Sequence, residues 1–300
     1  MAKHCSAIAS LIVSLACLGT LQSTPAKFNG QRAIEDIRKL VAIGPRVAGT
    51  PGAQSARDYI RKELEAVGVT VEEQPFEATT PNGRVKMVNL RATFAAGSAT
   101  SSTERLVIGG HYDTKLFKEF AFVGANDGGS SAAFLIELGR ALKGRTNRVP
   151  IELLFLDGEE AVGEWQGTDH TYGSRYYVEA ARQSGTLGSI RAFVLVDMIG
   201  DRDLQIKRDL NSTTWLTDVI WAAAQKQQLG AYFRPERVQI EDDHMPFMEA
   251  GVPSVDIIDL EYPAWHTAGD TLDAVSARSL QVVGDTLVAA LPQIEARLTK

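Results

Sequence analysis

The sequence predicts an α/β fold, in the form of a single three-layer α/β/α domain with a mostly parallel central sheet. Short apolar runs of strand length alternate with segments whose apolar residues recur at helical spacing, which is the pattern of βαβ units. Several apolar runs end in an acidic residue or a histidine, as expected where buried parallel strands end. No internal repeat or linker separates a second domain.

Two helices are predicted ahead of the sheet. Residues 31–42 carry apolar side chains at helical spacing until a Gly-Pro pair interrupts the pattern. A second helix is expected over residues 52–67, where Thr50 can cap the N-terminus and Pro51 fits the first turn. Both helices therefore have a sequence signal at one end at least.

The strands of the sheet begin with a predicted hairpin. Residues 69–76 and 85–94 are typical of strands, and the turn at 80–83 separates them. Further along, strands and helices alternate, and the longest irregular stretches adjoin polar strand ends, where loops are often functional. The expected strands are 106–110, 151–156, 192–196 and 255–258, the helices 130–142, 172–182, 213–227 and 276–298, and the long loops 113–129, 157–171 and 259–275.

The N-terminus is typical of an export signal. Lys3 and His4 precede an apolar stretch, 7–18, of about 12 residues, which is too short to span a bilayer and suits a signal-peptide core. We expect a signal peptide over residues 1–26, with an approximate end, and a single catalytic domain over 27–300. This predicts a periplasmic or secreted protein.

Cysteine usage and charge limit the chemistry. Cys5 and Cys17 are the only cysteines, so the mature domain has no disulfide and no catalytic thiol. Cys17 follows Ser-Leu-Ala, a weak match to a lipoprotein signal, so a lipid anchor is an alternative to a free mature protein. A net charge of −6 suggests neither nucleic acid nor an anionic membrane as partner, and no oligomeric state is indicated.

Seven residues of metal-binding types follow the predicted strands. His111 and Asp113 come directly after the strand at 106–110, and Glu159-Glu160 come shortly after the one at 151–156. Oxygen and imidazole ligands without thiolates suit a zinc site of the hydrolytic kind, which leaves a coordination position open to substrate. The remaining members are Asp127, Asp197 and His266.

Each residue alone has a structural explanation. Asp127 between polar and glycine residues could simply cap the next helix, and His111 could be an ordinary buried histidine. A purely structural role explains Asp197 less well, because a carboxylate at a buried strand end needs a partner. Motifs for a nucleophilic serine, an H-E-x-x-H zinc site, a phosphate loop and a dinucleotide site are absent. The set therefore indicates a metal-dependent enzyme.

These residues resemble the M28 metallopeptidase family, from G-P-R-V-A-G-T-P-G at 44–52 to W-H-T-A-G-D-T-L-D at 265–273. The resemblance implies a zinc-exopeptidase-like fold. It rests on five ordered motifs: H-Y-D at 111–113, N-D at 126–127, D-G-E-E at 157–160, D-M-I-G at 197–200 and H-T-x-x-D at 266–270.

Within the family, the chain is more similar to the glutaminyl cyclases, in a bacterial form. Trp165 follows Glu160 by five residues, and Trp265 directly precedes His266. The runs D-H-T-Y-G-S-R-Y at 169–176 and E-D-D-H-M-P-F at 241–247 look like cyclase segments. One departure is N-D-G-G-S-S at 126–131, which differs from animal cyclases, whose nearby cysteine pair is also absent.

The cyclase resemblance implies one Zn²⁺ held by Asp127, Glu160 and His266. Glu159 would move the proton during conversion of an N-terminal glutamine to pyroglutamate, and ammonia would leave. The resemblance further implies that Asp197 and Asp242 share hydrogen bonds with Glu159, that Trp165 and Trp265 wall the substrate pocket, and that His111 and Asp113 act as hydrogen-bonding supports.

Two alternatives remain open at this stage. In a di-zinc aminopeptidase, His111, Asp127 and Asp197 would hold a second Zn²⁺, with Asp127 bridging and Asp113 orienting His111. Both enzymes would act on the N-termini of peptides or proteins. A non-catalytic binding ectodomain of the same fold is the third interpretation, and retention of every ligand and of Glu159 disfavours it.

Overall fold

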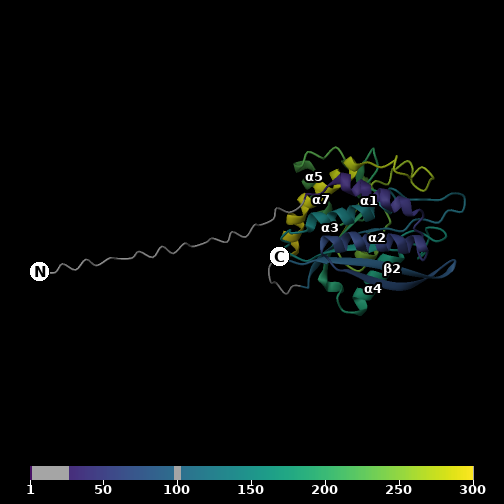
Figure 1. Ribbon diagram of the computed structural model, residues 1–300, viewed down its shortest axis with the longest axis horizontal. Helices are drawn as coiled ribbons and strands as arrows, with labels where there is room; N and C mark the ends of the chain where they lie inside the picture. The colour runs from purple at the N-terminus through teal and green to yellow at the C-terminus, as the bar shows by residue number, and fades with distance from the viewer. Residues whose placement is uncertain (2–26, 98–102, 300) are drawn as a thin grey trace.

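The structure is a computed structural model that describes residue 1 and residues 27–97 and 103–299 (Figure 1). Residues 2–26 of the predicted signal peptide, with Cys17 among them, lie outside the described residues. In the part of the chain that is described, no helix is long and apolar enough to cross a membrane.

A six-stranded sheet forms the centre of the molecule, with the strand order β1-β2-β4-β3-β5-β8. The four strands β4, β3, β5 and β8 are parallel, and β2 joins β4 antiparallel as part of a hairpin with β1. The bounds are β1 (Val71–Thr80), β2 (Gly83–Phe94), β3 (Arg105–His111), β4 (Ile151–Leu156), β5 (Ile190–Asp197) and β8 (Ser254–Ile258).

Helices cover both faces of the sheet, which confirms the predicted three-layer fold (Figure 1). One layer holds five helices, and the opposite layer holds α4 and α6, with the short 3₁₀ turn Leu187–Ser189 after α4. The first layer consists of α1 (Gly30–Ile43), α2 (Pro51–Val67), α3 (Gly129–Leu142), α5 (Thr214–Lys226) and α7 (Ala277–Leu298); the second consists of α4 (Tyr172–Gln183) and α6 (His244–Glu249).

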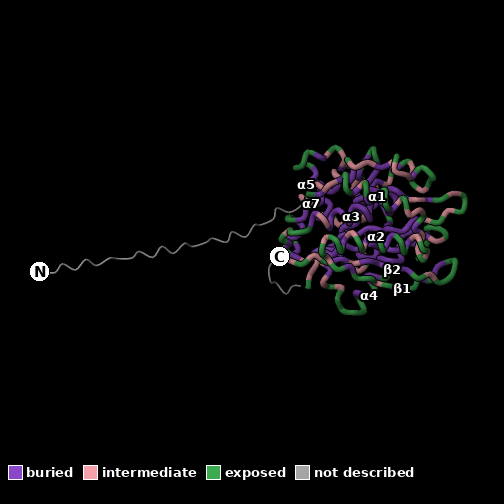
Figure 2. The backbone as a smooth tube through the Cα atoms, viewed as in Figure 1, coloured by how far each residue is buried: buried purple, intermediate pink, exposed green. Residues whose placement is uncertain are grey.

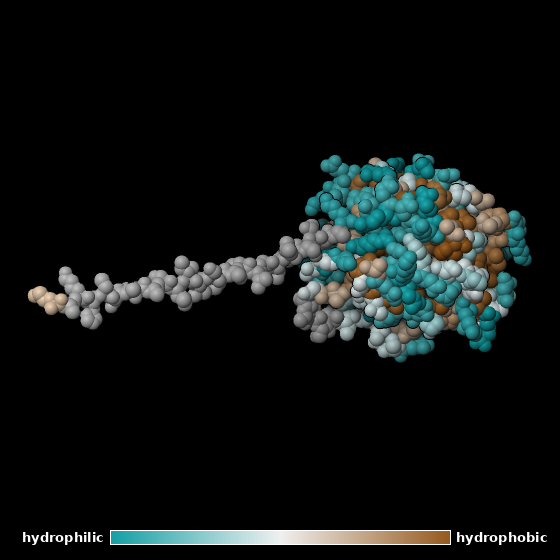
Figure 3. Space-filling view, in the orientation of Figure 1, coloured by the Kyte–Doolittle hydropathy of each residue, from teal (hydrophilic) through white to brown (hydrophobic). Residues whose placement is uncertain are grey.

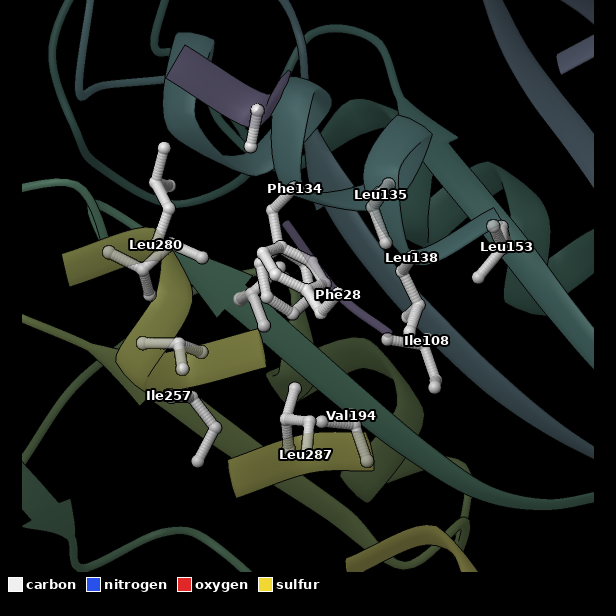
Figure 4. Packing of buried hydrophobic residues seen from close by; sticks show 14 of the residues in the cluster. Phe28, Ile108, Phe134, Leu135, Leu138, Leu153, Val194, Ile257, Leu280 and Leu287 are labelled. Carbon is white, nitrogen blue, oxygen red and sulfur yellow. The ribbon is translucent and has the colours of Figure 1, made fainter. Parts of the chain in front are cut away.

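The central strands are buried on both faces. In β4, Leu153 and Phe155 pack toward the five-helix layer, whereas Leu154 and Leu156 pack toward α4 and α6. This explains why the strand is continuously apolar rather than alternating. Figure 2 shows the buried interior and the exposed outer loops, and Figure 4 shows the larger core, where Phe134 of α3 meets other helices and strands.

Helix ends follow the local chemistry. The Thr50 side chain accepts a hydrogen bond from the Ala53 N–H, Pro51 occupies the first turn, and Gly68 ends the helix in the left-handed conformation with φ of 99°. The predicted start of α2 is therefore confirmed, because the cap uses an otherwise unpaired N–H group.

Three short elements were not predicted. Strands β6 (Ile206–Asp209) and β7 (Phe233–Val238) pair in a separate two-stranded sheet, and α6 has only six residues. Their sequences carry weak signals, because β7 is mostly polar and contains a proline, and α6 also contains one.

The surface seen in Figure 3 is mostly hydrophilic.

Candidate active site

The seven predicted residues gather at the carboxyl edge of the parallel strands. His111 is the last residue of β3, Asp197 is the last residue of β5, and the two adjacent glutamates follow β4. Asp127 precedes α3, and His266 lies in the loop between β8 and α7. Parallel strands end at the same edge, so residues far apart in the sequence meet there.

Asp127 lies between two histidines. Its Oδ1 is 3.3 Å from His111 Nε2, and its Oδ2 is 3.3 Å from His266 Nε2. Two groups of residues thus share Asp127, and within each the ligand atoms lie within 4.8 Å of one another: His111, Asp127 and Asp197, and Asp127, Glu160 and His266. The side chain of Asp127 makes no capping hydrogen bond to α3, whose N-cap is Gly128.

The second group fits a divalent metal. Asp127 Oδ2 and Glu160 Oε2 are buried and accept no hydrogen bond. Buried carboxylate oxygens without a partner are costly, and a cation would remove that cost. One imidazole nitrogen and two carboxylates, with no thiolate, also match the donors that zinc takes in catalytic sites.

The first group is already supplied with hydrogen-bond donors. Asp197 Oδ1 accepts the Met198 N–H at 2.8 Å and the Ser131 hydroxyl at 3.3 Å, and it lies 3.1 Å from His111 Nε2. His111 Nδ1 is 3.5 Å from Asp113 Oδ1. The two groups therefore differ in how much a metal would add.

Asp113 does more than face His111. Its carboxylate accepts the backbone N–H of Glu159 at 3.2 Å and that of Glu160 at 3.3 Å. A single buried side chain thereby fixes both glutamates relative to β3. Asp113 lies two residues after His111 at the end of β3, and the glutamates follow β4. The two hydrogen bonds therefore set the distance between His111 and the glutamates.

Two residues were missed as parts of the site. Asp270 accepts the N–H of Asn126 at 2.8 Å and that of Asp127 at 3.1 Å, which holds the Asp127 backbone. Arg46 is fully buried and donates to the carbonyl oxygens of Tyr112, Val123 and Gly124, so it ties the loop after β3. Both residues belong to sequence motifs that could have pointed to them. Asp270 is the last residue of H-T-x-x-D, and Arg46 is the arginine of G-P-R.

The backbone is constrained where the ligands lie. Gly128 follows Asp127 with φ of 72°, and a Cβ there would lie 2.3 Å from the Asp113 carbonyl oxygen. Only glycine fits such a close approach, which explains the N-D-G-G sequence. His266 has φ of 53°, an uncommon conformation for a side-chain-bearing residue that clusters at functional sites.

A cavity of about 510 Å³ opens beside these ligands. Glu159, Asp242, Trp165 and Trp265 line it together with Asp127, Asp197, Glu160 and His266, so every predicted site residue except His111 and Asp113 borders it. Trp165 and Trp265 are 36% and 44% exposed, which places them at the mouth rather than in the core. His111 and Asp113 are buried behind the cavity wall.

The carboxyl groups that face the cavity hold protons readily. Burial raises the pKa of Glu159 well above its usual range, and the charges of Asp242 and Glu160 add to this against the opposing effect of His111. Burial likewise raises the pKa of Asp242, with a contribution from Asp197. Carboxyl groups with raised pKa are typical of residues that accept and return a proton in catalysis.

The fold and the shared carboxylate between two histidines define the class of zinc-exopeptidase-like proteins. The chain belongs to peptidase family M28, whose family model matches residues 89–291. The predicted family is confirmed.

Similar sequences and solved structures place the chain among the glutaminyl cyclases of this family. A glutaminyl-peptide cyclotransferase-like protein of Mus musculus is 32% identical over 268 residues, which cover 78% of this chain and 68% of the mouse protein. The crystal structure of an Acidobacteriales bacterium glutaminyl cyclase matches with a TM-score of 0.86 and 40% identity, over 94% of this chain and 100% of that chain.

The peptidase branch has the same fold. The structure of a leucine aminopeptidase precursor from Bacteroides thetaiotaomicron matches with a TM-score of 0.80 and 25% identity, over 89% of this chain and 98% of that chain. The architecture is therefore common to both branches, and the choice between their chemistries depends on the site.

Zinc affinity should depend on pH. Burial opposes a charge on His266, but the carboxylates of Asp127 and Glu160, each 3.3 Å from its Nε2, outweigh it and raise the pKa of His266 to about 9. Zinc needs the neutral imidazole, so binding must displace this proton. Burial raises the pKa of Glu160 to about 7, so this ligand also holds a proton at lower pH. We expect the apparent affinity to rise about tenfold per pH unit between about pH 7 and pH 9, more steeply below about pH 7, and to level off above about pH 9. Competition with a chelator of known affinity measures this, and a flat profile would contradict the assignment.

Proposed function

We propose that the protein is a zinc-dependent glutaminyl-peptide cyclotransferase, which converts an N-terminal glutamine to pyroglutamate and releases ammonia. The observation that carries this proposal is the cavity, whose lining brings together Glu159 and Asp242, two carboxyl groups with raised pKa, two tryptophans and a metal-binding group. The cyclase relatives support the same conclusion, and the substrates would be the N-termini of peptides or proteins.

Asp127, Glu160 and His266 would hold one Zn²⁺ in this proposal. When bound, the ion supplies Lewis-acid polarisation of the glutamine side-chain carbonyl. The unfilled oxygens of Asp127 and Glu160 favour this site, because Asp197 in the other group already accepts hydrogen bonds from Met198 and Ser131. That difference supports a proposal of one ion.

Glu159 would carry the proton. The α-amino nitrogen forms a bond to the side-chain amide carbon, and Glu159 takes a proton from that nitrogen. The carboxyl group then gives the proton to the amide nitrogen, whose bond to carbon breaks as ammonia leaves. A carboxyl group with a raised pKa suits both halves of this transfer.

Asp242 would act on Glu159 through its charge, and Asp197 would act on Asp242 in the same way. Asp197 Oδ1 accepts hydrogen bonds from Met198 and Ser131 and lies beside His111 Nε2. Asp242 Oδ1 accepts the Asp243 N–H. The carboxylate of Asp242 nevertheless favours the protonated form of Glu159. The hydrogen bonds from Asp197 and Asp242 to Glu159 that the sequence suggests remain a prediction, and the charge of Asp242 supports a protonated Glu159 beside them.

Trp165 and Trp265 would bind the substrate and limit water. Both line the cavity mouth, and the Trp265 ring lies 4.6 Å from the His266 ring. Water competes with the α-amine as nucleophile, so apolar walls favour cyclisation over hydrolysis. His111 and Asp113, buried behind the wall, would support the ligands and glutamates.

An M28 aminopeptidase with two Zn²⁺ is the second candidate. It is favoured by one observation, the intact group of His111, Asp127 and Asp197. Glu159 would then take a proton from the attacking water. A binding ectodomain without catalysis is the weakest candidate, because all ligands are retained. For all three, the N-terminal sequence supports export to the periplasm or medium.

A mixture of peptides that begin with Gln-Ala-Phe or Leu-Ala-Phe separates the two enzymes. Purified protein should remove ammonia from the glutamine peptide and leave the leucine peptide intact, as followed by mass spectrometry. Release of free N-terminal residues instead would overturn the cyclase and favour the aminopeptidase.

Glu159→Gln removes the proton carrier but none of the proposed ligands. We expect turnover to fall by about 100-fold or more, which is the scale of general acid–base catalysis, while zinc stays bound. Steady-state kinetics with metal analysis checks this. Turnover like that of the unchanged protein would remove Glu159 from the mechanism.

Substitution of each histidine tests the metal count. His266→Ala should lose zinc, because one of three ligands is gone, whereas His111→Ala should keep it. Elemental analysis of the dialysed variants measures both. Full zinc in His266→Ala would refute the ligand set, and loss of about half the zinc in His111→Ala would favour two ions.

A further inference from the structure

The loop between β4 and α4 carries Trp165 out over the cavity. Residues 163–168 are exposed, so the bulk of the protein does not hold them. Both ends of the loop are tied to the site, since the Thr171 N–H donates to the Glu159 carbonyl and the Tyr172 N–H to that of Gly158, each at 2.8 Å. The base of the loop is therefore fixed to the site. Beyond the base, only contacts within the loop can hold its exposed residues in place.

Asp169 holds the first turn of this loop. Its carboxylate accepts the backbone N–H groups of Val162, Gly163 and Glu164 at 3.1, 2.8 and 3.1 Å. Three donors on one carboxylate define the turn immediately before Trp165. They fix its backbone, but they do not touch the indole.

His170, the next residue, contacts the indole directly. The His170 and Trp165 rings are stacked, with centroids 4.1 Å apart and an angle of 11° between their planes. His170 is 4% exposed, and its Nδ1 lies 3.2 Å from the Thr171 hydroxyl, which also accepts from Arg175. Burial lowers the pKa of His170, and the charge of Arg175 adds to this, which favours the neutral form of the ring.

We propose that His170 is a positioning residue that holds the indole of Trp165 in place as a preformed wall of the substrate pocket. This inference rests on the proposed function for its effect on KM. The opposite tryptophan needs no such residue, because Trp265 packs on the proposed ligand His266. Residues 162–170 thus form a short arm in which Asp169 fixes the backbone and His170 fixes the ring.

The contribution of this contact should appear in binding. An indole that is already ordered loses no side-chain freedom when a peptide arrives. An aromatic stack of this kind changes a binding constant by about two- to tenfold. His170 borders neither the cavity nor the proposed metal ligands, so the chemical step should change little.

The test compares variants of the full chain with zinc bound, using a Gln-Ala-Phe peptide. His170→Ala should raise KM about three- to tenfold and change kcat less than about twofold, and His170→Phe, which restores a flat ring, should recover most of the loss. Tyr176→Ala is the matched control. It removes a stack of the same kind, with Phe76 at 4.6 Å and 11°, on an exposed ring that does not border the cavity, and KM should not change.

The double variant shows whether His170 acts through Trp165. In a Trp165→Ala background, His170→Ala should raise KM no further, because the partner is already gone. Equal effects of His170→Ala in both backgrounds would overturn the proposal, as would an unchanged KM in the single variant.

Hydrogen exchange gives a readout that does not depend on activity. In His170→Ala, the amides of 162–168 should exchange several-fold faster, whereas the core strands should be unchanged. If the protein does not cyclise glutamine peptides, the proposed function fails and this measurement still decides the positioning role. Unchanged exchange in the arm would refute that role. Faster exchange throughout the protein would also refute it, because His170 would then stabilise the whole fold rather than position Trp165.

Discussion

The crowding of buried carboxyl groups at one edge of the sheet is the constraint on which the rest of the structure depends. Asp127, Glu160 and Asp197 are all buried within reach of two histidines. Like charges in a poorly solvated place repel, and they are tolerated only with protons, hydrogen-bond donors or a cation. His111 and His266 lower the pKa of Asp127 below its usual range, while the glutamates instead keep their protons more readily.

The surroundings of the site are organised to hold these groups in place. Asp113 binds the backbone of both glutamates, Asp270 binds that of Asp127, and Arg46 fixes the loop between them. The burial of Arg46 lowers its pKa to about 10, and the charges of Asp270 and Asp113 oppose that change. These partners are themselves buried and paired, so a shift of any one would disturb several others. These contacts therefore arrange the site before a substrate arrives, which is the preorganisation that favours catalysis.

Hydrogen bonding at this edge is one difference between the one-ion and two-ion proposals. The group around His111 retains the residues for a second ion, yet Asp197 is engaged by Met198 and Ser131. The cavity walls add a second distinction, since Trp165 and Trp265 form an apolar mouth. Trp165 stands on a loop beyond the strand ends, and binding residues are often found on such loops.

The sequence by itself determined the layers and most of the site. Continuous apolar strands implied a sheet buried on both faces, and polar residues at their ends implied one shared edge, because parallel strands finish together. His111, Glu160 and Asp197 could be identified in this way, whereas Asp127 and His266 were proposed as ligands from the family resemblance. Only the tertiary structure decided which atoms meet: His111 and Asp197 are 86 residues apart, and Asp113 and Glu159 are 46 apart. Such contacts depend on packing between elements to within about an ångström, and neither the period of a strand nor the spacing of a motif carries that information. For the same reason Asp270, Arg46 and the stack of His170 on Trp165 emerged only with the fold, as did the weakly patterned β6 and β7.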